Sequence, residues 1–188
     1  MRIIGGKYKG RRLKTPKDNK IIRPTSDRVK EAIFNILGEK VQNSRVLDLF
    51  CGTGSLGLEA LSRGASHVVF VDKSSLSLKL VKSNLELIGE CEKALLIKSD
   101  VFKAFGRLAA EKKVFDVVFV DPPYKERFHK AILEELALKG LMEKEGVVVY
   151  ETSKKYEFAE PIPLFVMTRS KGYGDTKVSF FLYVGEEV

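Results

Sequence analysis

Short apolar runs alternate with amphipathic stretches from residue 45 of this 188-residue chain onward. A run of about four to eight apolar residues suits a buried strand, whereas apolar positions three and four apart suit one face of a helix. The strand-like runs are Val46–Phe50, Val68–Val71, Ala94–Ile97, Phe115–Val120 and Val147–Tyr150, and the helix-like stretches between them are Leu56–Ser62, Ser75–Ile88, Val101–Glu111 and Arg127–Leu138. Such alternation predicts an α/β fold with a parallel sheet and helices on both faces.

The last part of the chain departs from this alternation. Leu164–Thr168 and Val178–Val184 are both strand-like, and no helix-like stretch lies between them. We expect them to form an antiparallel hairpin at one edge of the sheet. The sheet would then have seven strands, most of them parallel, with an antiparallel strand at the C-terminus.

Two domains of unequal size are expected. Residues 25–188 would form the α/β domain, and residues 1–24 a small basic hairpin or arm, because short apolar pairs there alternate with glycine and basic residues. Ser26 or Asp27 is suited to cap the first helix of the α/β domain. The apolar face of that helix begins at Val29, and Lys30 is expected on its polar face.

Composition excludes several classes of protein. Hydrophobic residues are 44% and charged residues 31% of the chain, which excludes a disordered or collagen-like protein. No apolar run approaches the roughly 18 residues of a membrane helix, and the N-terminus lacks the apolar segment of a secretory signal. We therefore expect a cytoplasmic protein without a membrane partner. Cys51 and Cys91 fit no ligand spacing, so free thiols and no bound metal are expected.

Positive charge is concentrated at the N-terminus. The formal net charge is +8, yet residues 1–30 alone carry 11 basic and 2 acidic residues. The rest of the chain is nearly neutral, so the arm suits a polyanion, and nucleic acid is the first candidate. The alternative is a solvated basic tail without a partner.

The strand Val46–Phe50 runs directly into the glycine-rich loop Gly52-Thr53-Gly54-Ser55-Leu56-Gly57. This spacing matches the G-x-G-x-x-G pattern of nucleotide cofactor sites, where glycines let the backbone approach a ligand closely. Asp72 ends the next predicted strand, 20 positions after Gly52, where a carboxylate can accept hydrogen bonds from both ribose hydroxyls. An adenosine-containing cofactor is therefore expected; the alternative is a structural turn followed by a solvated aspartate.

Asp48 distinguishes between two such cofactors. It lies in the strand four residues before Gly52, where a carboxylate would repel the pyrophosphate of NAD but suit the ammonium and sulfonium groups of S-adenosyl-L-methionine. Asp48 would alternatively bond the loop amides and have a structural role. Asp100 follows the third strand and is suited to bind the adenine amino group, to cap the next helix, or both.

The fourth strand ends in Asp121-Pro122-Pro123-Tyr124 at the same edge of the sheet. The two prolines stiffen the turn and leave its carbonyl groups as acceptors. Asp121 and the Pro122 carbonyl suit the two N–H bonds of an exocyclic amino group on a base, and Tyr124 is suited to stack on the base. Direct methyl transfer to that amine needs positioning and fixed acceptors but no covalent enzyme intermediate.

Several stretches together resemble the RsmD family of class I methyltransferases, which have a Rossmann-like fold and methylate the N2 amino group of one guanine in bacterial small-subunit (16S) ribosomal RNA. The resemblance covers nearly the whole chain. The stretches are Arg2–Gly6, Arg23–Thr25 with Asp27–Val29, Val46–Phe50 with Gly52–Gly54, Leu58–Ala65, and Asp121–Tyr124. Gly172–Lys177 also resembles the family, but its role is open.

The resemblance implies a role for each matching residue. Asp48, Phe50, Gly52, Gly54, Asp72 and Asp100 would bind the cofactor, S-adenosyl-L-methionine, and Asp121, Pro122 and Tyr124 would hold the target base. Arg2, Lys7, Lys9, Arg11, Arg12, Arg23 and Arg28 would contact RNA. The implied partner is 16S ribosomal RNA or the partly assembled small subunit.

Two other functions remain open at this point. An adenine N6 methyltransferase acting on DNA or RNA would use the same Asp-Pro-Pro-Tyr turn, but 188 residues leave no room for a separate DNA-recognition domain. A non-catalytic RNA-binding protein is disfavoured because the acidic site residues are present. His67 and His129 have no partner at ligand spacing and are expected to be ordinary structural residues.

Overall fold

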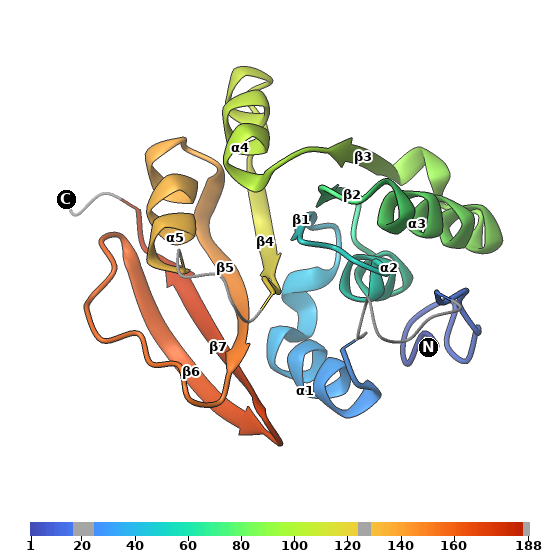
Figure 1. The fold of residues 1–188 in the computed structure, drawn as a ribbon, viewed down its shortest axis with the longest axis horizontal. Helices are drawn as coiled ribbons and strands as arrows, with labels where there is room; N and C mark the ends of the chain where they lie inside the picture. Colours follow the sequence, from blue (N-terminus) through green and yellow to red (C-terminus); the bar gives the residue numbers. More distant parts are fainter. Residues whose placement is uncertain (17–24, 124–128, 186–188) are drawn as a thin grey trace.

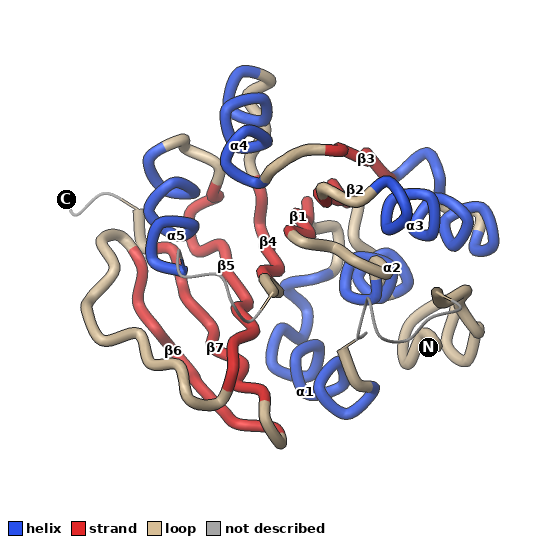
Figure 2. The backbone as a smooth tube through the Cα atoms, in the orientation of Figure 1, coloured by secondary structure: helices blue, strands red, loops and turns tan. Residues whose placement is uncertain are grey.

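The computed structural model describes residues 1–16, 25–123 and 129–185, and their path is drawn in Figures 1 and 2. The strands of these residues form one seven-stranded sheet in the order β3-β2-β1-β4-β5-β7-β6. They are β1 (Arg45–Leu49), β2 (His67–Asp72), β3 (Ala94–Lys98), β4 (Phe115–Val120), β5 (Met142–Ser153), β6 (Phe165–Tyr173) and β7 (Thr176–Tyr183). The helices are α1 (Asp27–Leu37), α2 (Ser55–Ser62), α3 (Ser75–Ile88), α4 (Val101–Ala110) and α5 (His129–Leu138), with short 3-10 turns at Gly38–Val41 and Cys91–Lys93.

The sheet confirms the predicted α/β fold. Strands β3, β2, β1, β4 and β5 pair in parallel, and β7 is antiparallel to both of its neighbours, β5 and β6. The strand order reverses beside β1, and ligand sites of open α/β sheets lie beyond the carboxyl ends of the strands at such a point. The fold therefore places the loops after β1 and β4 side by side.

The predicted strand lengths are less accurate at the C-terminal side. Strand β5 extends from Met142 to Ser153, well beyond the predicted Val147–Tyr150, and β6 continues to Tyr173. The part of β5 that was not predicted contains exposed polar residues such as Glu143 and Lys144, which interrupt the apolar run expected of a buried strand. Pairing with β7 extends to Ser153 opposite Thr176 and accounts for the extra length.

Helices cover both faces of the sheet, and each face has its own hydrophobic core. One core packs α1, α2 and α3 against residues such as Phe70 and Phe119, and the rings of Phe34 and Phe119 lie 5.7 Å apart. The other core packs α4 and α5 against Val118 and Val148. Among the described residues, no helix is long and apolar enough to cross a membrane.

Residues 1–13, the N-terminal hairpin, lie beside α2 and α3 (Figure 1). An isolated antiparallel bridge joins Arg2 to Arg12, and the side chains of Ile3 and Leu13 are buried in the first core. The predicted hairpin is therefore present over these residues, and the remainder of the predicted arm includes residues 17–24, outside the described part of the chain.

Helix α1 begins as predicted, with the Ser26 hydroxyl accepting a hydrogen bond from the amide of Val29. The prediction that Lys30 lies on a polar, exposed face is wrong, because its side chain is completely buried. Its ammonium donates to the backbone carbonyl of Arg2 at 2.5 Å and lies 3.9 Å from the buried carboxylate of Glu59. The hairpin covers this face of α1, which the helical pattern alone does not reveal.

Candidate active site

The carboxyl edge of the parallel strands brings together the acidic residues predicted from the sequence. Asp48 lies in β1, Asp72 ends β2, and Asp100 and Asp121 follow β3 and β4. Because these strands are parallel and adjacent, their carboxyl ends meet, and the predicted residues lie together at one edge of the sheet. Their individual roles stay predictions.

The loop between β1 and α2 has a tight backbone that requires glycine. Gly52 and Gly54 both have positive φ angles, 51° and 73°, and Gly54 is the N-cap residue of α2. A Cβ atom on Gly54 would lie 2.8 Å from the side chain of Val81. Phe50 also has a positive φ of 56°, a strained conformation for a bulky residue that often marks a functional loop.

Asp48 is buried near the end of β1, just before this loop. Its Oδ2 accepts a hydrogen bond from the backbone amide of Gly57 at 2.9 Å. Burial raises the pKa of the carboxyl to about 8; the Gly57 hydrogen bond opposes that shift, and the charge of Asp72 adds to it. The structural role that we weighed for Asp48 is thus present, and the carboxyl is also placed where a nearby cation would stabilise its charged form.

Asp72 and Asp100 are held by local hydrogen bonds. Asp72 accepts from the amide of Gly52 at 2.9 Å and from the amide of Ser74 at 2.8 Å. Asp100 caps α4 by accepting from the amide of Phe102 at 3.0 Å, and the Lys73 ammonium, 3.0 Å away, lowers its pKa. Each carboxylate oxygen can accept more than one hydrogen bond, so these contacts leave capacity for a ligand.

Asp121 and Pro122 follow β4 directly, and Tyr124 lies outside the described residues. Asp121 is partly exposed, but dense packing around its carboxyl raises its pKa well above the usual range. The negative charges of Glu151 and Asp48 raise it further. A hydrogen-bond donor or a cation arriving here would therefore stabilise the ionised form of Asp121.

The described residues offer neither an activated thiol nor a metal site. Burial raises the pKa of the Cys51 thiol well above its usual value, which disfavours the thiolate that a nucleophile needs. His129 is buried with Nδ1 3.0 Å from the hydroxyl of Tyr150, which agrees with a structural role. Both cysteines are free, and no group of three or more potential metal ligands occurs in this part of the chain.

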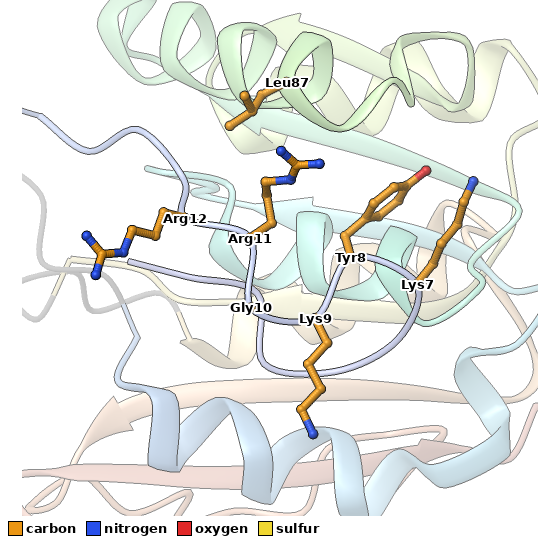
Figure 3. A pocket seen from close by; sticks show the side chains of 7 residues that line it. All are labelled: Lys7, Tyr8, Lys9, Gly10, Arg11, Arg12 and Leu87. Carbon is orange, nitrogen blue, oxygen red and sulfur yellow. The ribbon is translucent and has the colours of Figure 1, made fainter.

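Four side chains of the predicted RNA-binding set line a pocket of about 590 Å³ on the N-terminal hairpin (Figure 3). These are Lys7, Lys9, Arg11 and Arg12, and the Arg11 side chain extends toward Leu87 of α3. Lys7 already pairs with Glu90 at 3.4 Å. The side chains of Lys9, Arg11 and Arg12 are exposed, so their charges are available to a polyanion.

The other members of that set lie elsewhere. Arg2 pairs with Asp27 at 2.8 Å, Arg28 is exposed on α1, and Arg23 lies outside the described residues. Contact with RNA stays a prediction for all of them.

The family model described as "Conserved hypothetical protein 95" matches residues 1–182. YlbH of Bacillus subtilis (strain 168) is 40% identical over 181 residues, which cover 96% of this chain and 98% of the relative. The "Ribosomal RNA small subunit methyltransferase D" of Escherichia coli (strain K12) is 35% identical over 153 residues, 81% of this chain and 74% of the relative. The chain belongs to the RsmD family. The solved structure of yhhF from Escherichia coli has a TM-score of 0.87 and 28% identity over 99% of both chains.

The stretch Leu58–Ala65, one of those that resemble the RsmD family, fixes the N-terminal hairpin to α2. Glu59 Oε2 accepts from the amide of Ile4 at 2.9 Å, and the Ser62 hydroxyl donates to the Gly5 carbonyl at 2.6 Å. The amide of Lys7 donates to the carbonyl of Ser62 at 2.7 Å. The sequence pattern alone does not predict these roles of Glu59 and Ser62. The available signal is that Glu59 is the one charged residue in a helical stretch otherwise rich in apolar residues.

Gly172–Lys177, whose role was open, forms the end of β6, the start of β7 and the turn between them, and so the predicted hairpin is present. The Lys177 ammonium donates to the carbonyl of Tyr156 at 2.8 Å and pairs with Glu157. The amide of Lys154 donates to the carbonyl of Asp175 at 2.7 Å. In this RsmD family member the segment therefore holds the loop that follows the carboxyl end of β5.

Proposed function

We propose that this protein transfers a methyl group from S-adenosyl-L-methionine to the N2 amino group of a specific guanine in 16S ribosomal RNA. The observation that carries this proposal is the meeting of Asp48, beside the glycine loop, with the Asp121-Pro122 turn at one edge of the sheet. The names of relatives such as "Ribosomal RNA small subunit methyltransferase D" support the ribosomal substrate. Small-subunit RNA or a partly assembled subunit, in the cytoplasm, is the partner that we propose.

The chain has acceptors that fit the positively charged cofactor. The carboxyl of Asp48 is buried and has a raised pKa, so a sulfonium or ammonium group nearby would stabilise its ionised form. Gly52 and Gly54, with Phe50, would shape the loop against the methionine part, Asp72 would bind the ribose, and Asp100 would bind the adenine. When bound, the cofactor supplies an electrophilic methyl group.

Asp121 and the carbonyl of Pro122 would position the amine. Hydrogen bonds to its two N–H groups turn the nitrogen lone pair toward the methyl carbon. The nitrogen would then be aligned with the electrophilic methyl group that the bound cofactor would supply, with sulfur as the leaving atom. Asp121 would accept the proton that the methylated amine loses and pass it to water, because the basicity of its carboxylate is raised. Tyr124 would stack on the flipped-out base.

The N-terminal hairpin would bind the RNA backbone. Lys9, Arg11 and Arg12 present positive charge on one exposed surface, and contacts to phosphate depend on charge and RNA shape more than on sequence. Hydrogen bonds between the hairpin and α2 hold this surface in a fixed relation to the cofactor loop, where α2 begins.

Methyl transfer from labelled S-adenosyl-L-methionine tests the proposal. The substrates are unmodified 16S ribosomal RNA, partly assembled small subunits, transfer RNA and duplex DNA, and the labelled nucleoside is identified by mass spectrometry. We expect N2-methylguanosine from the ribosomal substrates alone. Asp121→Ala should abolish methyl transfer yet retain RNA binding. Asp175→Asn, at an exposed turn, is the control and should leave methyl transfer unchanged. N6-methyladenine as the product would replace the proposal with the adenine alternative.

A further inference from the structure

Glu151 in β5 lies beside the Asp121-Pro122 turn and is not used in the mechanism above. In the sheet, Asp48 pairs with Phe119, and Phe119 pairs with Val149. Side chains two residues apart on a strand point to the same face. Glu151 follows Val149 by two positions within β5, so its side chain lies on the face of the sheet that carries Asp48. Asp121 directly follows Val120, and Val120 pairs with Tyr150, the residue before Glu151.

Glu151 is also buried, with 8% of its surface exposed. Its negative charge contributes to the raised pKa of Asp121, which agrees with their neighbouring positions on β5 and after β4. Each carboxyl group offers two acceptor oxygens. Two carboxyl groups side by side therefore suit a ligand with several adjacent N–H donors.

Guanine has such an edge, whereas adenine does not. The N2 amino group of guanine is flanked by N1–H, which gives three N–H donors in a row on the Watson–Crick edge. The N6 amino group of adenine is flanked instead by N1 as an acceptor, whose lone pair would face a carboxylate. Enzymes that flip a base out of the stack recognise it through this edge.

We propose that Glu151 accepts a hydrogen bond from N1–H of the target guanine and so selects guanine over bases whose N1 carries no hydrogen. Asp121 and the Pro122 carbonyl accept the two N2–H bonds, and the three acceptors together match the three donors. This inference rests on the proposed function. It assigns the choice of base to Glu151 and leaves alignment of the amine to the Asp121-Pro122 turn.

A substrate with one altered base tests the assignment. Once the methylated position is located with the wild-type enzyme, the RNA is rebuilt by ligation with either guanosine or 2-aminopurine riboside at that position. 2-Aminopurine keeps the amino group at C2, but its N1 carries no hydrogen. We expect wild-type kcat/KM to be lower for 2-aminopurine by at least about 10-fold, because one good base-edge contact discriminates by that order.

Glu151→Gln isolates the contribution of this side chain. A carboxamide can accept from the N1–H of guanine and can also donate to the bare N1 of 2-aminopurine. The ratio of kcat/KM for the guanosine substrate to kcat/KM for the 2-aminopurine substrate should therefore be about 10-fold smaller in the variant than in the wild type. The loss of O6 in 2-aminopurine affects both enzymes equally and cancels in the comparison. Glu145→Gln, an exposed position on the same strand, should keep the wild-type preference.

The outcomes separate the two proposals. An unchanged preference in Glu151→Gln, with wild-type methylation of guanine N2 intact, would overturn the assignment of Glu151 alone. Equal wild-type rates on the two bases would do the same without any variant, so the test does not depend on correct folding of Glu151→Gln. Absence of N2-methylguanosine from wild-type reactions would overturn the proposed function and this inference with it.

Discussion

The carboxylate Oδ2 of Asp48 accepts a hydrogen bond from the backbone amide of Gly57 at 2.9 Å. This contact joins β1 to the first turn of α2 across the glycine loop. The two ends of the loop are therefore held together by the chain's own hydrogen bond. One hydrogen bond does not compensate for burial, and the pKa of Asp48 rises to about 8. The chain therefore keeps a costly carboxyl group where a cationic ligand is expected.

Replacing Asp48 by asparagine should stabilise the fold in a pH-dependent way. The folded pKa of about 8 exceeds the ordinary value of 3.8, so the wild type loses stability as the pH rises from about 4 to 8. The asparagine side chain would keep an acceptor for the Gly57 amide and would not titrate. The difference in free energy of unfolding should grow by up to about 1.4 kcal/mol per pH unit and flatten above pH 8. Urea unfolding of both proteins at pH 5, 6, 7, 8 and 9 measures this.

The same substitution should weaken binding of S-adenosyl-L-methionine. A neutral carboxamide cannot compensate for the positive charge of the ligand, and the loss should be larger at pH 8 than at pH 6, where Asp48 of the wild type is mostly protonated. Titration calorimetry of both proteins gives the affinity ratio at each pH. A ratio that is independent of pH would contradict the electrostatic role of Asp48.

Gly57→Ala should disturb the same contact sterically. The added Cβ would lie 2.3 Å from Cε1 of Phe70, a fully buried ring, and 2.9 Å from Oδ2 of Asp48. Overpacking of this kind typically costs about 1–3 kcal/mol of unfolding free energy. Gly106→Ala in α4 is the control, because no atom lies within 4 Å of its added Cβ. It should stabilise by about 0.5–1 kcal/mol. Equal unfolding midpoints for both variants in urea would refute the steric argument.

Removing the carboxylate of Glu59 should destabilise the fold and release the N-terminal hairpin. Glu59 and Lys30 are both completely buried, and Glu59 also accepts from the Ile4 amide at 2.9 Å and from Arg63 Nε at 2.8 Å. Glu59→Ala would leave the Lys30 ammonium with only the partly exposed carboxylate of Asp27, 3.7 Å away, at a cost of about 3 kcal/mol, the lower end for breaking a buried ion pair. Hydrogen exchange should then lose protection at Ile4 and its hairpin neighbours, as observed by mass spectrometry.

Two further variants separate charge burial from hairpin attachment. Lys30→Met combined with Glu59→Ala should recover part of the unfolding free energy but not the protection of the Ile4 amide, which would still lack its acceptor. Glu31→Ala, at an exposed position of α1, should leave both quantities unchanged. If the double variant restored protection at Ile4, the attachment would not depend on Glu59.

Features with a local cause were predictable from the sequence. The β1 strand, the glycine loop and the start of α1 follow from hydrophobic period, glycine spacing and a capping residue, and the structure confirms them. The Asp48, Asp72 and Asp121 carboxyls were brought to one edge by a topological rule that applies to any parallel sheet. That part of the site needed no knowledge of side-chain contacts.

Features caused by distant contacts were not predictable in this way. Lys30 was placed on the solvent side of α1 because the helical pattern cannot show that the hairpin covers it. Glu59 and Glu151 were overlooked for the same reason: one is buried by a segment 55 residues away, and the other becomes part of the site only through the register of β5 with β4. The hydrophobic period of a sequence predicts which face of a single helix or strand is apolar. The environment of these three side chains depends instead on which other segments pack against that helix or strand.

The exposed cations of the N-terminal hairpin should control the salt dependence of RNA binding. Each phosphate contact releases counterions, so Arg11→Ala or Arg12→Ala should weaken affinity for ribosomal RNA and reduce the slope of log K against log salt by about 1. Lys7→Ala should change the slope less, because Lys7 is already paired with Glu90. Fluorescence anisotropy at several salt concentrations measures these slopes.

Lys139→Ala, an exposed cation at the end of α5, is the control and should leave the slope at its wild-type value. If the salt slope of Arg11→Ala or Arg12→Ala equalled that of Lys139→Ala, the substituted arginine would not contact phosphate. The basic surface would then be solvated, which is the alternative that charge asymmetry alone leaves open. A reduced slope with unchanged transfer to saturating RNA would place these arginines in binding and not in the methyl-transfer step.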